Sequence, residues 1–249
     1  MNKLEVRGVS KRFGDQQVLD DVSITMKEGE LVCLLGISGA GKSTLFNIIS
    51  GLMLPDKGQV LLDGEDITGK TGRISYMLQK DLLLPYRTIV DNAALPLLLQ
   101  GVPKQEARKQ ASAHFADFGL EGTENKWPHQ LSGGMRQRAA LLRTYLFSQN
   151  VALLDEPFSA LDHQTRLSVS ADIHRIIRQE GKTSLLVTHD ISEAISLSDR
   201  VVVFSHRPAT VKHIHDLSAL RHYSPMERRA QPEFQTLFHQ LWKELDIHV

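Results

Sequence analysis

The sequence predicts an α/β protein with a mainly parallel sheet and a helical subdomain inserted into it. Short apolar strands alternate with helical stretches in both the N-terminal and C-terminal parts of the chain, whereas residues 81–147 have a mostly helical pattern. Strands that alternate with helices favour a parallel sheet with both faces covered. We therefore expect an α/β core made of residues 1–80 and 148–249, with the helical subdomain over residues 81–147.

Apolar runs locate the individual strands. The predicted strand at residues 30–35 is apolar without alternation, which is typical of a strand buried on both faces. It leads directly into a glycine-rich loop, and a helical stretch follows at residues 45–51. Further strands are predicted at residues 4–9, 18–26, 58–64, 73–78, 151–154, 184–188 and 201–204.

Helical spacing of apolar residues locates the helices. The last of them, over residues 232–245, is amphipathic and has Pro232 near its first turn. This pattern favours a helix packed on the core, and a helix that faces a membrane or a partner is the alternative. The other helices are predicted at residues 89–100, 104–118, 132–147, 163–180 and 191–198.

Composition excludes several classes of protein. Lys plus Arg equals Asp plus Glu, at 29 each, so net charge gives no reason to expect nucleic acid as a partner. The one cysteine, Cys33, lies in an apolar run, which predicts a small buried residue. A single cysteine cannot form a disulfide within the chain, which favours a reducing compartment. No apolar run approaches the ~20 residues that span a bilayer, and the charged start does not resemble a signal peptide. We expect a cytosolic chain whose contact with a membrane depends on a partner.

The glycine-rich loop fits the pattern G-x-x-x-x-G-K-[ST], which predicts a site for nucleotide phosphates. Glycines let successive backbone amides face one anion, and the N-terminus of the following helix favours the same charge. Lys42 is expected to reach the β- and γ-phosphates, and the Ser43 hydroxyl to bind Mg2+. A glycine turn that binds nothing is the alternative, but the required strand and helix flank this one. The loop comprises Gly36, Ile37, Ser38, Gly39, Ala40, Gly41, Lys42, Ser43 and Thr44.

Two carboxylates follow the predicted strand at residues 151–154. An enzyme that uses a phosphate loop needs a carboxylate near the metal, and Asp155 is expected to hold Mg2+ through a water. Glu156 would orient or deprotonate the attacking water. A solvated strand end would explain this pair equally well in isolation, and the phosphate loop earlier in the chain favours the catalytic interpretation.

A further motif resembles one family of ATPases. Residues 131–138 read Leu-Ser-Gly-Gly-Met-Arg-Gln-Arg, which is similar to the signature L-S-G-G-x-x-Q-R of ABC transporter ATPases. Ser132 would cap a helix, while Gly133 and Gly134 would let its backbone approach phosphate. The resemblance implies a nucleotide-hydrolysing core of the RecA type with an antiparallel β subdomain, and it covers nearly the whole chain.

The resemblance assigns roles to four other positions. Gln79 matches the family's Q-loop glutamine, which contacts Mg2+ and the attacking water, and His189 matches the histidine that contacts the γ-phosphate. Residues 159–162, Ser-Ala-Leu-Asp, resemble the D-loop, so Asp162 is assigned to the nucleotide site. Phe13 stands where the family places an aromatic ring that stacks on adenine, a position where Tyr is commoner.

The family also implies a mechanism that needs two chains. Two copies would lie head to tail, with ATP between the phosphate loop of one copy and Ser132–Gly134 of the other. Loss of the γ-phosphate would then open the dimer, as in other switches that depend on one phosphate.

The segment after Gln79, residues 81–92, resembles the bacterial importers of nitrate, sulfonates, taurine or thiamine-precursor pyrimidines, although most of these carry Trp where this chain has Tyr86. The resemblance implies separate transmembrane permease subunits that contact residues 82–92, an extracytoplasmic substrate-binding protein, and a position at the cytoplasmic face of the membrane. The substrate itself would not touch this subunit.

Two other classes of protein remain as alternatives. A soluble ABC ATPase of translation or DNA repair would usually carry two ATPase sets or long coiled coils, and neither is present. A non-catalytic regulatory module would be expected to lose Lys42, Glu156 or His189. Six of the 11 histidines follow Ser205, and scattered surface histidines explain them better than a metal site, because they lack companion cysteines or carboxylate clusters.

Overall fold

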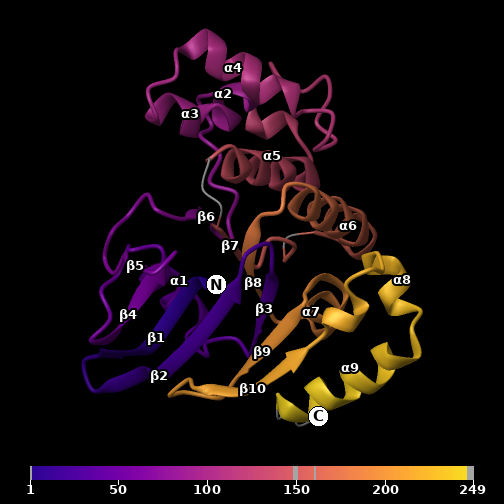
Figure 1. The fold of residues 1–249 in the computed structure, drawn as a ribbon. Helices are drawn as coiled ribbons and strands as arrows, with labels where there is room; N and C mark the ends of the chain where they lie inside the picture. The colour runs from indigo at the N-terminus through magenta and orange to yellow at the C-terminus, as the bar shows by residue number, and fades with distance from the viewer. Residues whose placement is uncertain (1, 148–150, 160, 246–249) are drawn as a thin grey trace.

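A computed structural model describes residues 2–147, 151–159 and 161–245 of the chain. Two sheets form its lower part in Figure 1, and helices α2 to α5 lie together above them. Helices α7, α8 and α9 lie on the side of the larger sheet that carries the C-terminus. The predicted α/β class is confirmed, while the proposed boundaries of a helical subdomain at residues 81 and 147 stay a prediction.

The larger sheet has six strands in the order β10-β9-β3-β8-β7-β6. Its central strand β3 pairs in parallel with β8 and β9, and all five of its residues are buried, as its unbroken apolar sequence predicts. Only β10 runs antiparallel, against β9. The carboxyl ends of β3, β7 and β8 therefore share one edge, where three of the predicted motifs begin. The strands are β3 (Leu31–Leu35), β6 (Ser75–Met77), β7 (Val151–Asp155), β8 (Thr183–Thr188), β9 (Arg200–Phe204) and β10 (Val211–Asp216).

The smaller sheet is antiparallel and has the order β2-β1-β4-β5. Val22, Ile24 and Met26 of β2 are buried, while the residues between them are exposed, so one face of this sheet packs on the core. The antiparallel β region implied by the family resemblance is present, and its strands β1 and β2 are longer than the apolar runs predicted. The strands are β1 (Asn2–Phe13), β2 (Gln16–Lys27), β4 (Lys57–Leu62) and β5 (Glu65–Asp66).

Most predicted helices are present, and two of them differ from expectation. The helix predicted over residues 89–100 divides at Ala94, because Pro96 lacks the amide hydrogen that would continue the ladder. The helix predicted over residues 104–118 ends at Ala113. Strands β5 and β10, whose residues are mostly exposed, and the short helix α8 have no counterpart among the predicted elements. The helices are α1 (Lys42–Ile49), α2 (Ile89–Ala93), α3 (Leu95–Leu99), α4 (Lys104–Ala113), α5 (Gly133–Leu146), α6 (His163–Gln179), α7 (Ile191–Leu197), α8 (Pro225–Arg229) and α9 (Pro232–Glu244), with 3-10 turns at Pro128–Gln130 and Ser218–Leu220.

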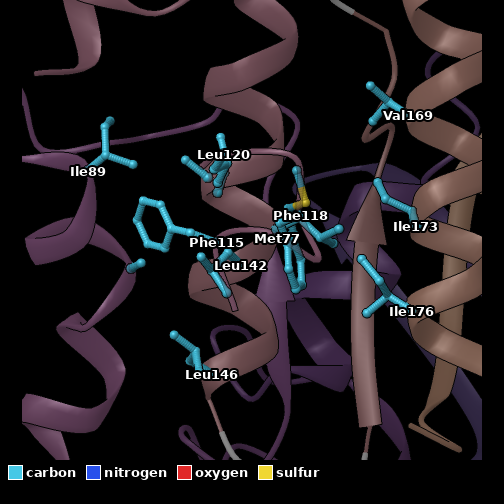
Figure 2. Close-up of a cluster of buried hydrophobic side chains, with 14 of the residues drawn as sticks. Met77, Ile89, Phe115, Phe118, Leu120, Leu142, Leu146, Val169, Ile173 and Ile176 are labelled. Carbon is cyan, nitrogen blue, oxygen red and sulfur yellow. The ribbon is translucent and has the colours of Figure 1, made fainter. Parts of the chain in front are cut away.

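One apolar cluster joins the upper helices to the sheet. Figure 2 shows Phe115 beside Leu142 of α5, and Met77 of β6 beside Phe118. The same cluster extends to Ile173 on α6. Helix α5, which carries the signature motif, is thus held by packing on both the helical side and the sheet side.

Helix α9 packs on the core, which confirms the favoured interpretation of the C-terminal pattern. Phe234 and Leu241 are buried in a cluster with Cys33 and Leu35 of β3. Burial raises the pKa of the Cys33 thiol, so this residue is an inert part of the core, as expected.

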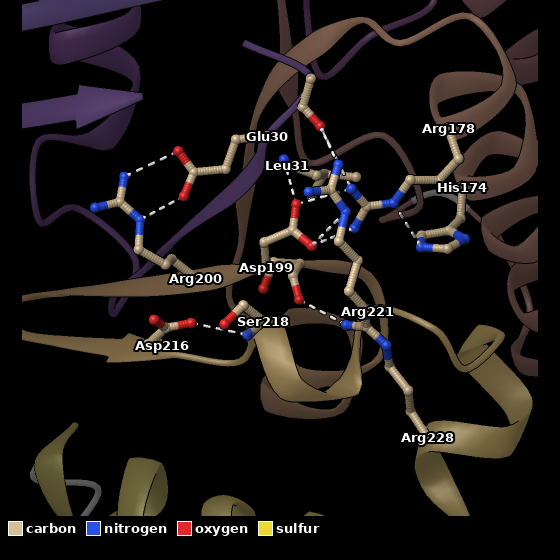
Figure 3. Close-up of polar contacts among 12 residues, drawn as sticks. Glu30, Leu31, His174, Arg178, Asp199, Arg200, Asp216, Ser218, Arg221 and Arg228 are labelled. Carbon is tan, nitrogen blue, oxygen red and sulfur yellow. Dashed lines mark hydrogen bonds and ion pairs between the residues drawn. The ribbon is translucent and has the colours of Figure 1, made fainter. Parts of the chain in front are cut away.

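A polar cluster, largely buried except for Arg221, lies between the sheet and the C-terminal elements (Figure 3). We call it the Asp199 cluster and define it as His174, Arg178, Asp199, Arg221 and Arg228. Both oxygens of Asp199 accept hydrogen bonds of 2.7 Å from Arg178, and one oxygen also accepts from the Leu31 amide. Arg228 is fully buried and donates to the carbonyls of Ile195 and Ser198. The cluster therefore ties α6, the start of β9 and α8 together.

Candidate nucleotide-binding and hydrolysis site

The phosphate loop follows β3 and ends where α1 begins. Gly41 has φ 97°, and a Cβ at this position would lie 3.0 Å from side chains of Val18 and Leu19, so both conformation and space require glycine. The Lys42 ammonium donates to the carbonyls of Gly36, at 2.7 Å, and Ile37, at 2.8 Å. Lys42 at the end of the loop is thus hydrogen-bonded to two carbonyls at its start.

Lys42 is held in a nearly buried position next to two acids. Burial lowers the pKa of its ammonium, and the negative charges of Glu156 and Asp155 oppose that effect. Both carboxylates therefore lie close enough to Lys42 to interact with its charge. This position agrees with the phosphate-binding role that the sequence motif predicts for the lysine.

Asp155 ends β7 beside the loop. Its pKa is raised by burial, while a hydrogen bond with the Ser43 hydroxyl acts in the opposite direction. The Tyr76 hydroxyl also donates to Asp155 Oδ2 at 3.4 Å. The carboxylate is therefore fixed next to the hydroxyl that the sequence assigned to the same metal.

Glu156 directly follows Asp155 and has a left-handed backbone, with φ 45°. One carboxylate oxygen accepts from Gln79 Nε2 at 3.0 Å, and the other lies 3.3 Å from His189 Nδ1. Three residues that are 33 to 110 positions apart in the chain meet at one carboxylate. The structure thus brings together the residues that the sequence assigned to the attacking water and the γ-phosphate.

These side chains open on a cleft of about 350 Å³. Phosphate-loop residues form one wall, and the predicted catalytic side chains form another. Arg207, from the loop between β9 and β10, also lines the cleft and was not predicted, because it belongs to no motif in the sequence. The lining residues are Ser38, Gly39, Gly41, Lys42, Ser43, Thr44, Gln79, Glu156, His189 and Arg207.

The signature residues do not line this cleft. The Ser132 hydroxyl accepts from the Met135 amide at 3.3 Å and caps α5, as predicted. A Cβ on Gly134 would lie 2.8 Å from Thr165, so the start of α5 packs too closely for a larger residue. Gly133, between them, begins the helix. These residues are positioned as a capped helix N-terminus at a separate place on the surface.

Asp162 and Phe13, which the family resemblance assigned to the nucleotide, also lie outside the cleft. Asp162 caps α6 by accepting from the Thr165 amide at 3.0 Å, whereas Ala160 of the predicted D-loop lies outside the described residues. Phe13 ends β1 with 47% of its surface exposed, and the Lys11 ammonium lies 5.8 Å from its ring centre. An exposed ring at this position is available for stacking, but no described side chain of the cleft touches it.

The donors assigned to Mg2+ are the Ser43 hydroxyl, the Gln79 amide oxygen and the Asp155 carboxylate. All are oxygen donors, which Mg2+ prefers, and the Ser43 hydroxyl lies beside the Asp155 carboxylate. The described part of the chain contains no group of three His, Cys, Asp or Glu side chains that would form a complete protein cage. The residues present therefore fit an ion that takes its remaining ligands from phosphate and water.

A phosphate loop at the end of a central parallel strand, with a carboxylate, a glutamine and a histidine around one cleft, defines an ATP-hydrolysing protein. A family model described as "ABC transporter" matches residues 19–159. The chain belongs to the ABC transporter family, in which it is an ATP-binding subunit with ATPase activity.

Particular relatives agree with this assignment. The chain is 48% identical to the formylaminopyrimidine import ATP-binding protein ThiZ of Halalkalibacterium halodurans, over 77% of this chain and 74% of that protein. It is 44% identical to the aliphatic sulfonates import ATP-binding protein SsuB 1 of Rhodococcus jostii, over 83% and 81%. The ATP-binding cassette MJ0796, solved as a dimer with ADP and Pi, superposes with a TM-score of 0.75 at 31% identity, covering 86% of this chain and 98% of that one. The predicted resemblance to importer subunits is thereby confirmed.

No helix within residues 2–147, 151–159 and 161–245 has the length and apolar character needed to cross a membrane.

Proposed function

We propose that this chain is the ATP-hydrolysing subunit of a bacterial ABC importer, and that it powers uptake of a small nutrient through separate transmembrane subunits at the cytoplasmic face of the membrane. The observation that carries the proposal is the meeting of Gln79 and His189 at Glu156, beside the phosphate loop. A regulatory module has no need to keep this arrangement.

The residues of the cleft divide the chemistry among them. The backbone of Gly39, Ala40 and Gly41 and the Lys42 ammonium bind phosphate oxygens, and Thr44 contributes near the α-phosphate. Ser43, Gln79 and Asp155 would hold Mg2+, which would supply positive charge to the phosphates when bound.

Glu156 orients the attacking water and accepts its proton, while His189 contacts the γ-phosphate. In this conformation both oxygens of Glu156 are engaged, one by Gln79 and one by His189. The Lys42 ammonium is likewise held by loop carbonyls. ATP therefore enters a site whose catalytic side chains already contact one another and the phosphate loop.

The complete site needs a second copy of the chain. Ser132, Gly133 and Gly134 form a capped helix N-terminus that lies away from the cleft, and such an N-terminus favours an anion. We propose that it faces the ATP bound to the other copy, with Asp162 near the same interface and Phe13 stacking on adenine. The dimer described for MJ0796, 31% identical to this chain, supports this arrangement.

The permease is proposed to bind the surface that follows Gln79. Leu82, Tyr86 and Leu99 are 51%, 70% and 77% exposed, which is unusual for large apolar side chains. Beside them a groove of about 280 Å³ is lined by Leu52, Leu99 and Arg143. Such a groove suits an amphipathic helix from a membrane subunit.

The nutrient is proposed to be a nitrate-, sulfonate- or taurine-like anion or a thiamine-precursor pyrimidine, delivered by an extracytoplasmic binding protein. The relatives named for sulfonate and formylaminopyrimidine import support both classes. The alternative function is a soluble ABC ATPase without a role in transport.

Co-expression with candidate multi-span membrane subunits tests the proposal. We expect the two to co-purify in detergent, and the substitution Tyr86→Asp to weaken that complex while ATP binding persists. A chain that hydrolyses ATP but never co-purifies with a membrane protein would favour the soluble alternative.

A further inference from the structure

Arg207 belongs to a loop that the fold holds against the phosphate site. The loop follows β9, which lies directly beside β3, and Phe204 Cβ lies 3.2 Å from where a Cβ on Gly36 would be. The Ala209 amide donates to the Val18 carbonyl, and the Ala209 carbonyl accepts from Asp20, each at 2.9 Å. The loop is therefore anchored to the strands on both sides of the phosphate loop.

The loop is also stabilised internally. The Ser205 hydroxyl oxygen accepts from the Thr210 amide at 2.9 Å and donates to the Pro208 carbonyl. An arginine carried by such an anchored loop starts from a restricted position, so less freedom is lost when it binds a ligand.

The guanidinium of Arg207 lines the same cleft as Lys42 and Ser43. Its Nη2 lies 3.8 Å from the position of a Cβ on Gly39, the first left-handed glycine of the loop. Within the described residues the structure gives this guanidinium no hydrogen bond and no ion pair. By contrast, Arg136 and Arg178 each contact a carboxylate.

We propose that Arg207 binds phosphate oxygens of the nucleotide, as a second cation beside Lys42. Its planar group offers donors in a fork that matches two phosphate oxygens, which the single ammonium of Lys42 cannot do. The proposal rests on ATP binding at the phosphate loop and adds a residue from outside every motif used to define that site. A different role, pairing with an acidic residue of a second copy of the chain, is the competing outcome of the test.

Calorimetric titration of the Mg2+-ADP complex into the purified chain separates these roles, because the diphosphate probes one chain without the ATP-bound dimer. We expect Arg207→Ala to raise the Kd about tenfold, Arg207→Lys to recover part of the loss, and the neighbouring exposed His206→Ala to stay within about twofold of the unaltered chain. Equal melting temperatures would show that the variants fold.

The proposal is overturned if Arg207→Ala binds ADP as tightly as the unaltered chain. It is equally overturned if that variant loses only the ATP-dependent dimer, measured by light scattering in the Glu156→Gln background. Failure of the unaltered chain to bind ADP would instead remove the proposed function.

Discussion

The catalytic cleft and the Asp199 cluster use the same kinds of side chain in opposite ways. In the cluster, the Asp199 carboxylate is 4% exposed and receives two short hydrogen bonds from one guanidinium. In the cleft, the His189 side chain is 58% exposed, and Arg207 has no described protein partner. In the cluster the Asp199 carboxylate is fully paired within the protein, whereas the cleft leaves the Arg207 guanidinium facing open space.

This difference in pairing predicts that the Asp199 cluster contributes mainly to stability and the cleft mainly to function. Charges that are buried with partners hold elements in place, and removal of one partner leaves the other buried and uncompensated. Charges that line an open cleft cost less to change and determine what binds there. We therefore expect substitutions in the cleft to alter catalysis with little effect on folding, and substitutions in the cluster to do the reverse.

The largest effect is expected from Glu156→Gln. Removing the base should lower the ATP turnover number by a hundredfold to ten-thousandfold, because positioned acid–base groups typically contribute that much. ATP binding and the free energy of unfolding should change little, since Gln can still accept from Gln79. Steady-state phosphate release measures turnover, and Glu28→Gln, which changes an exposed glutamate, is the matched control. Near-normal turnover in Glu156→Gln would exclude it as the base.

The next largest effect is expected from Asp199→Ala, which should reduce stability and leave catalysis of the folded protein nearly unchanged. The change leaves the Arg178 guanidinium without its carboxylate and removes a negative charge that favours the fully buried Arg228 cation, so it should lower the free energy of unfolding by about 3–5 kcal/mol. Urea unfolding measures this loss. The control is Asp63→Asn, which removes a mostly exposed partner of Lys3 and should cost less than about 1 kcal/mol. Equal losses from the two variants would mean that burial does not distinguish these pairs.

The smallest of the three effects is a dependence on pH. Burial, followed by the charges of Arg178 and Arg228, lowers the pKa of His174 to about 4, and Arg178 donates to its ring nitrogen. The unfolded chain therefore binds more protons between pH ~6.5 and about 4, so stability falls as pH decreases through that window, by at most about 3 kcal/mol. Urea unfolding across this range should show a shallower slope for His174→Gln. The exposed His163→Gln should keep the original slope, and an unchanged slope for His174→Gln would contradict the assignment.

The sequence predicted the parts of the molecule that depend on local order. The phosphate loop needs glycines and a lysine at fixed spacing after a strand, and Asp155 and Glu156 follow a strand in the same way. Both patterns are visible in one stretch of chain. The three-way contact of Gln79, Glu156 and His189 was expected only through family resemblance, because no local rule brings residues so distant in sequence together.

Arg207 and the Asp199 cluster could not be predicted for the same reason. Arg207 reaches the cleft because β9 pairs with β3 and Ala209 pairs with β2, which are contacts between distant segments. Arg178 and Asp199 are 21 residues apart and belong to different elements. The break between α2 and α3 has a local cause and could have been predicted. Pro96 stands within the helical pattern of residues 89–100 and interrupts it.

The central claim is that each ATP site is shared by two copies of the chain, and a disulfide across the proposed interface tests it most directly. Ser38 lines the cleft, Ser132 caps the signature helix, and the natural Cys33 is too buried to compete. In the Glu156→Gln background, the double variant Ser38→Cys, Ser132→Cys should form a covalent dimer on oxidation with ATP, while neither single variant should form a covalent dimer. A disulfide within one chain, or equal dimer formation without ATP, would contradict the account.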